Sequence, residues 1–208
     1  MRTTDYNYKQ ERKEEHHMNK KHKITINSPI VLGFAAICLA ATILNYITVG
    51  VSNRMLFMTY HSSLTSPMTY LRFFTHVFGH ADWAHFIGNM SYILLLGPML
   101  EEKYTAPVLV EVIAVTAVIT GLINYVFFWQ YALCGASGVV FAFILMSSFT
   151  SFKEGEIPLT FILVAVLYIG QQIVQGITIN DNVSNMAHII GGIVGGAMGY
   201  ALNRKKAS

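Results

Sequence analysis

Six apolar runs of about membrane-crossing length constrain this chain more than any other feature. A helix needs roughly 20 mainly apolar residues to cross a hydrocarbon layer of about 30 Å. The runs cover residues 29–50, 84–100, 105–128, 134–152, 157–176 and 186–203. Glu111, in the third run, is the one charged residue within them. The sequence therefore predicts an all-α membrane protein in which six transmembrane helices form one bundle.

The distribution of Lys and Arg supports an even number of spans. An even number puts both chain ends on one side, and positive residues gather on the cytosolic side of a membrane. Seven of the fourteen Lys and Arg residues lie within the first 23 residues. In the six-span arrangement twelve of the fourteen fall on the side of the termini, and Arg54 and Arg72 fall opposite. We therefore expect both termini in the cytosol of a multi-pass membrane protein.

The composition excludes several other classes. The chain is 53% hydrophobic and 12% charged, which is unlike a soluble domain. Its net charge of +3 collects at the membrane ends rather than on an aromatic-rich basic face, which argues against a nucleic-acid partner. Cys38 and Cys134 have no partner at metal-binding spacing. This composition fits a protein surrounded by membrane lipid.

The chain divides into three parts. Residues 1–28 are polar, lack the apolar core of a signal sequence, and are predicted to be a cytosolic tail. Residues 29–204 form the six-span domain, and residues 205–208 are a basic cytosolic end. Without a further domain, the compact chain suggests a bacterial plasma membrane.

One connection is long. Residues 51–83, called the first outer loop below, are rich in aromatic residues and Met but contain Arg54, His61, Arg72 and His76. The loop is too polar to span a membrane and too apolar to remain free in water. It is therefore predicted to be amphipathic and to lie in the outer interface.

Four polar residues lie near the starts of even-numbered runs. His85 and Asn89 are in the second run, Ser137 in the fourth and His188 in the sixth. Even-numbered spans run from outside to inside in this topology, so the four residues share nearly one depth. Polar side chains inside a membrane are costly, face the bundle interior and mark function. We expect the four to meet.

These residue types suit nucleophilic catalysis. Ser137 offers a hydroxyl and His188 a base, which is the minimum pair, and no Asp or Glu lies at that depth as a third member. His85 and Asn89 share one helix face and, with the Ser137 N–H, are candidate donors to an oxyanion. Each residue alone has a structural interpretation, as a packing serine or a helix cap. Their shared depth favours chemistry, whereas Glu111 lies near the cytosolic face, where its side chain can reach water.

Two other chemistries fit less well. His76, His80 and His85 suggest zinc, but a zinc protease has H-E-x-x-H and this chain reads "HVFGH". No metal is therefore expected. The "GASGV" stretch differs from the G-x-S-x-G turn of soluble hydrolases because Val139 replaces the second glycine.

Three motifs resemble those of the rhomboid family of intramembrane serine proteases. Residues 135–138, "GASG", resemble the family's GxSG motif, with Gly135 and Gly138 around Ser137. "HADWAHFIGN" resembles its HxxxxHxxxN motif, with His80, His85 and Asn89 in place. "AHIIGGIVGG" resembles its last catalytic helix, with Gly191 and Gly195 after His188. "EEKY" resembles its acidic-basic loop at Glu101, and the likeness covers about residues 30 to 204.

The resemblance implies a fold, an activity and residue roles. It implies a six-helix core whose cavity opens to the outside and whose Ser–His dyad cleaves peptide bonds in or beside transmembrane helices of substrate proteins. Ser137 is then the nucleophile and His188 the general base, while His85, Asn89 and the Ser137 N–H hold the oxyanion. His80 and Arg72 then organise the first outer loop. The resemblance implies no cofactor.

The chain departs from the family pattern at two positions, and other functions stay open. Leu71 stands where many members have Trp, and Phe141 stands where many have Tyr, although its aromatic face can still pack on His188. A catalytically silent rhomboid-like protein that binds membrane helices remains an alternative. A transporter fits six spans but lacks charges at the midplane.

Overall fold

The computed structural model describes residues 25–150, 159–164, 166–167, 170 and 182–205. In this part of the chain the regular structure is helical, as predicted, apart from one isolated antiparallel bridge between Thr59 and Leu133. The α-helices are α2 (Pro29–Ile47), α3 (Pro67–Thr75), α4 (Trp83–Tyr104), α5 (Ala106–Phe127), α6 (Ser137–Ser147) and α8 (Asn182–Lys205). Two short helices, η1 (Asn53–Phe57) and η2 (His76–Phe78), flank α3. Most of the predicted cytosolic tail and the last three residues, 206–208, lie outside the described residues.

Helix occurs in the described part of every predicted apolar run. The helices α2, α4, α5 and α8 match the first, second, third and sixth runs within a few residues, and residues 159–164 of the fifth run are helical. By length and composition, α2 and α5 are apolar enough to cross a membrane. The number of helices that cross therefore stays a prediction.

The fourth run contains a shorter helix than predicted. α6 has 11 residues, which is about 16 Å at the rise of an α-helix. At its start, Gly135 has φ +128°, outside helical backbone geometry. At its end, the hydroxyls of Ser147 and Ser148 donate to the carbonyl of Ile144 at 2.7 and 3.4 Å, and residues 148–150 form turns.

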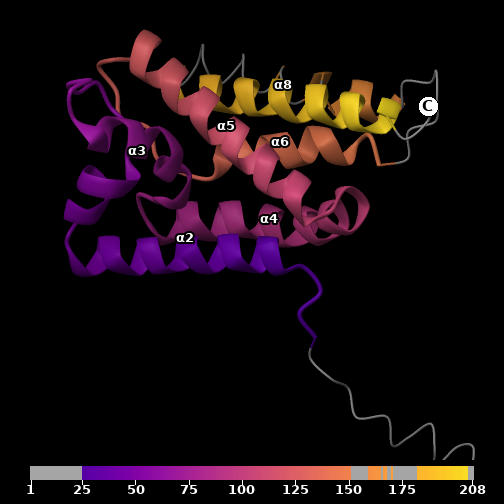
Figure 1. The fold of residues 1–208 in the computed structure, drawn as a ribbon, viewed down its shortest axis with the longest axis horizontal. Helices are drawn as coiled ribbons and strands as arrows, with labels where there is room; N and C mark the ends of the chain where they lie inside the picture. Colours follow the sequence, from indigo (N-terminus) through magenta and orange to yellow (C-terminus); the bar gives the residue numbers. More distant parts are fainter. Residues whose placement is uncertain (1–24, 151–158, 165, 168–169, 171–181, 206–208) are drawn as a thin grey trace, which may run out of the picture.

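The helices form a bundle that α5 crosses. In Figure 1, α2 and α4 lie side by side below, α6 and α8 lie above, and α5 runs obliquely across them. α3 packs against α5. The first residue of α2 and the last residue of α8 lie at the same end of the bundle (Figure 1).

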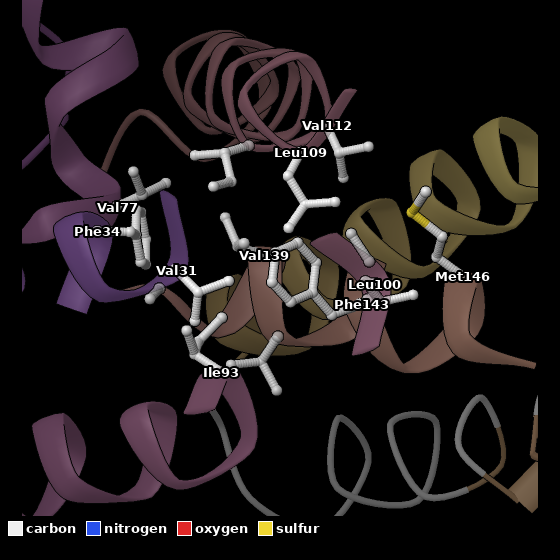
Figure 2. Packing of buried hydrophobic residues seen from close by; sticks show 14 of the residues in the cluster. Val31, Phe34, Val77, Ile93, Leu100, Leu109, Val112, Val139, Phe143 and Met146 are labelled. Carbon is white, nitrogen blue, oxygen red and sulfur yellow. The ribbon is translucent and has the colours of Figure 1, made fainter. Parts of the chain in front are cut away.

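The core lies where these helices converge. Figure 2 shows side chains from four helices meeting there: Val31 from α2, Ile93 from α4, Leu109 and Val112 from α5, and Val139 and Phe143 from α6. All six are fully buried. Burial of each large apolar side chain is worth roughly 1.5–3 kcal/mol in water.

A carboxylate of α4 caps the start of α2. Glu101 is buried, and its two oxygens accept hydrogen bonds from the backbone N–H groups of Ile30 and Val31, each at 3.1 Å. These N–H groups belong to the first turn of α2, where they have no partner within the helix. A negative charge at this end of a helix is also favoured by the helix dipole. Glu101 therefore joins two helices that are antiparallel neighbours.

Replacing Glu101 is expected to destabilise the protein. A Glu101→Ala protein loses two charge-assisted hydrogen bonds and leaves one buried and one partly buried N–H group unpaired, which costs about 2–4 kcal/mol in free energy of unfolding. Thermal unfolding in detergent measures the loss. Glu102→Ala is the matched control, because Glu102 is exposed and adjacent. Equal unfolding temperatures for the two variants would contradict the expectation.

A glycine stripe on α8 faces α6. A Cβ added at Gly191 would overlap the carbonyl of Gly138, and one added at Gly195 would overlap that of Ala142. Both numbers rise together along the two helices, so α6 and α8 run parallel. This close approach brings the starts of α6 and α8 to the same end of the bundle.

Candidate active site

Ser137 is the first residue of α6 and is half-buried. Its N–H belongs to the first turn of the helix, where the backbone donors have no helical partner. Residues 131–136, called the lead-in segment below, bring the chain to it. Gly135, in this segment, has the positive φ that favours glycine. The serine is therefore presented at a helix start behind a sharp change of backbone direction.

The side chains of His85 and Asn89 lie against the lead-in segment. Asp82 caps the start of α4, and its Oδ1 accepts from the His85 N–H at 2.8 Å. A Cβ built on Gly135 would lie 2.6 Å from Cε1 of His85, 2.7 Å from its Nε2 and 3.8 Å from Nδ2 of Asn89. The structure thus brings the two predicted donors of α4 to within two residues of Ser137 along the chain.

Asn89 has an unused donor at this place. Its side chain is 7% exposed, and Nδ2 has no hydrogen-bond partner among the described residues. A buried donor without a partner is costly and calls for an explanation. A developing oxyanion near Gly135 would supply the missing acceptor.

His188 lies beside α6 near Ser137. Its ring stacks on that of Phe141, with centroids 4.0 Å apart and planes 14° apart. Phe141 follows Ser137 by four residues, so the two share one face of α6. The residue before His188 is also close to α6, because the carbonyl oxygen of Ala187 lies 3.4 Å from a Cβ built on Gly138. The histidine is therefore positioned next to the turn that carries the serine.

Arg72 organises the first outer loop from α3. It is 6% exposed, its Nη1 donates to the hydroxyl of Tyr60, and its Nη2 donates to that of Ser62 at 2.9 Å. Its guanidinium also lies 4.2 Å from the centroid of the Tyr60 ring, within cation–π distance. Leu71, which stands where many rhomboids have Trp, is 45% exposed. Arg72 therefore joins α3 to the preceding part of the first outer loop through Tyr60 and Ser62, and the exposed side chain of Leu71 does not take part.

His80 is fully buried beside His85. Its Nδ1 donates to the carbonyl of Phe78 at 3.2 Å, and its ring meets that of His85 edge-on, with centroids 5.1 Å apart. The backbone carbonyl of His80 accepts from Asn53 at 2.9 Å and from Asn45 at 3.4 Å. Burial, together with the neighbouring His85, lowers the pKa of His80 from 6.5 to about 4. His80 thus supports both the loop and the ring that lies on Gly135.

His76 and a polar stripe on α5 were not assigned to the site from the sequence. His76 Nε2 donates to the carbonyl of Ala117 at 3.0 Å. Thr116, Thr120 and Asn124 follow at four-residue spacing, and each is at most 2% exposed. The methyl groups of the two threonines lie 3.6 and 3.4 Å from a Cβ built on Gly138, the residue after Ser137. The four-residue spacing of these polar residues within an apolar run is the sequence signal that could have indicated a buried polar stripe.

Buried His76 is expected to make the protein sensitive to acid. Burial lowers the pKa of His76 from 6.5 to about 4. Between these values the unfolded chain binds a proton that the folded protein does not, so stability is full above pH 6.5 and falls as the pH drops towards 4. A His76→Gln protein keeps a donor for Ala117 and should lose unfolding temperature less steeply between pH 7 and 5. An unchanged pH dependence would contradict this expectation.

The sequence also drew attention to Glu111 and to a possible zinc site. Glu111 is exposed near the start of α5, at the end of that helix away from the lead-in segment. Among the residues that the structure describes, no three His, Cys, Asp or Glu side chains are grouped so that they can hold a metal ion.

Comparisons with known proteins place the chain in a family. The family model of the Rhomboid domain matches residues 67–205. The match includes Ser137, His188, His85 and Asn89. A comparison with curated proteins finds no match. Because the family model covers more than half of the chain, this protein belongs to the rhomboid family.

Proposed function

We propose that this protein is an intramembrane serine endopeptidase that hydrolyses peptide bonds in or next to transmembrane helices of membrane-protein substrates. The family consists mainly of serine intramembrane proteases and also contains inactive homologues. The observation that carries the proposal is the surroundings of Ser137. His85 and Asn89 lie beside the position of a Cβ built on Gly135, and the ring of His188 stacks on Phe141.

The proposed reaction uses the dyad twice. The Ser137 hydroxyl attacks the substrate carbonyl while a neutral His188 takes its proton. The tetrahedral oxyanion accepts hydrogen bonds from His85, from Nδ2 of Asn89 and from the Ser137 N–H. The C–N bond then breaks, and His188 protonates the leaving amine. Water, deprotonated by His188, attacks the acyl-enzyme, and Ser137 recovers its proton as the second product leaves.

The proposed setting is a bacterial plasma membrane. Six spans, with both termini in the cytosol, fit the Lys and Arg distribution. They also fit the position of the described ends of α2 and α8 at one end of the bundle. The site then lies near the outer face. The first outer loop exposes large apolar side chains, which suits the membrane interface: Met55, Leu64, Tyr70, Leu71 and Phe74.

Labelling with a serine-directed fluorophosphonate tests the proposal. In this reaction the serine oxygen displaces fluoride at phosphorus, and His188 accepts the serine proton. We expect the detergent-solubilised protein to be labelled at Ser137, as located by mass spectrometry of its peptides, and Ser137→Ala protein to remain unlabelled. A folded protein that takes no label would favour the alternative, a silent binder of membrane helices.

A further inference from the structure

Backbone hydrogen bonds join the lead-in segment to the first outer loop. Thr59 and Leu133 exchange two of them, at 3.0 and 2.9 Å. The N–H of Gly135 donates to the carbonyl of His76 at 2.9 Å. Apart from the single bridge, the lead-in segment has no regular secondary structure. Its position therefore depends on contacts made from outside it.

Asn124, near the end of α5, bonds to both sides of this junction. Its Nδ2 lies 3.2 Å from the carbonyl oxygen of Tyr131, in the lead-in segment, and 3.4 Å from that of Thr59, in the first outer loop. An amide nitrogen carries two hydrogens, so one side chain can serve both acceptors. The two carbonyls also fix the orientation of the amide, because its oxygen cannot donate.

Burial makes this pair of contacts hard to replace. Asn124 is 2% exposed. Hydrogen bonds in such surroundings are electrostatically stronger than in water, and losing them leaves the buried Thr59 carbonyl with one partner fewer. A side chain without donors at this position would leave the backbone bonds of Thr59 with Leu133 and of Gly135 with His76, and would remove the side-chain link between the two segments.

We propose that Asn124 is a positioning residue for Ser137. By joining the carbonyls of Thr59 and Tyr131, it keeps the lead-in segment in register with the first outer loop and so sets where the serine hydroxyl and N–H stand. The inference rests on the proposed protease function. Reactive geometry is sensitive to such shifts, since a misplacement of about 1 Å can cost about a hundred-fold in rate.

The neighbouring residue on α5 provides a matched control. The hydroxyl of Tyr125 donates to the carbonyl of Ser62 at 2.6 Å, so it ties the same helix to the same loop. This hydrogen bond does not involve the lead-in segment. Tyr125→Phe therefore removes an attachment of the first outer loop and leaves the contact with Tyr131 in place.

The experiment compares Asn124→Leu, Tyr125→Phe and the unaltered protein. Leucine has the same branched skeleton as asparagine, with larger methyl groups in place of the amide atoms, and it has no donor. The rate constant of fluorophosphonate labelling, the kcat and KM for a single-span substrate, and the thermal unfolding temperature are measured for each. We expect Asn124→Leu to lower the labelling rate and kcat by about ten- to a hundred-fold with little change in KM. The labelling rate and kcat of Tyr125→Phe protein should stay within about two-fold of those of the unaltered protein, even if its unfolding temperature falls.

Two outcomes would overturn the inference. In one, Asn124→Leu is labelled as fast as the unaltered protein. In the other, Tyr125→Phe slows labelling as much as Asn124→Leu does, which would indicate a general loosening of the loop. If Asn124→Leu does not fold, Asn124→Ser replaces it, because its hydroxyl is too short to reach both carbonyls. An unaltered protein that takes no label would instead overturn the proposed function, and this inference with it.

Discussion

Ser137→Ala protein is expected to cleave a transmembrane substrate at a rate below detection. The substitution removes the attacking oxygen, and loss of the nucleophile costs a serine protease about six orders of magnitude in kcat. His188, Asn89 and His85 keep their places, but without a nucleophile they have no acyl-enzyme to form. The measurement is cleavage of a single-span substrate in lipid vesicles, followed by the appearance of both fragments.

Ser147→Ala is the matched control for this loss. Ser147 lies at the opposite end of α6, where its hydroxyl donates to the carbonyl of Ile144. We expect that variant to cleave as fast as the unaltered protein. Both variants should unfold near the same temperature, which separates a chemical loss from a structural one. Cleavage by purified Ser137→Ala protein would end the proposal of a serine protease.

The apolar runs predicted the positions of α2, α4, α5 and α8 to within a few residues. α4 ends at Tyr104, just after Glu101, Glu102 and Lys103. The fourth run overestimated the length of α6, because the backbone departs from helical geometry within an uncharged stretch. Gly135 lies outside helical geometry before α6, and residues 148–150 form turns after it. Hydropathy counts these residues as part of a run, although the local backbone does not continue the helix.

The positions of the candidate site residues along the helices were predictable from the sequence. The four polar residues near the starts of even-numbered runs do lie at the starts of α4, α6 and α8, and the glycine stripe on α8 indicated a close neighbour. The contacts were less accessible. Asn124 and Thr59 are 65 residues apart in sequence, and their bond depends on which carbonyl the first outer loop turns towards α5. A pattern of residue types does not contain that information.

Phe141 shows the same limit in a smaller form. The sequence placed an aromatic ring four residues after Ser137, and the resemblance suggested a packing role. The structure adds that this ring lies nearly parallel to that of His188. Stacking holds the imidazole by its face and does not involve its ring nitrogens. The phenol hydroxyl that many rhomboids carry here is therefore not required for the stacking itself.

Gly135→Ala is expected to lower kcat by about 10²–10³-fold, because it disturbs an oxyanion donor without touching the dyad. Gly135 has φ +128°, which alanine adopts only at a cost of about 1–3 kcal/mol, and the new Cβ would lie 2.6 Å from the His85 ring. The ring must move or the lead-in segment must shift. Gly88→Ala is the control, because a Cβ there, on the same α4 as His85, meets nothing within 4 Å. It should keep full activity and unfold at the same or a higher temperature. Full kcat in Gly135→Ala protein would mean that His85 does not hold the oxyanion from its place on Gly135.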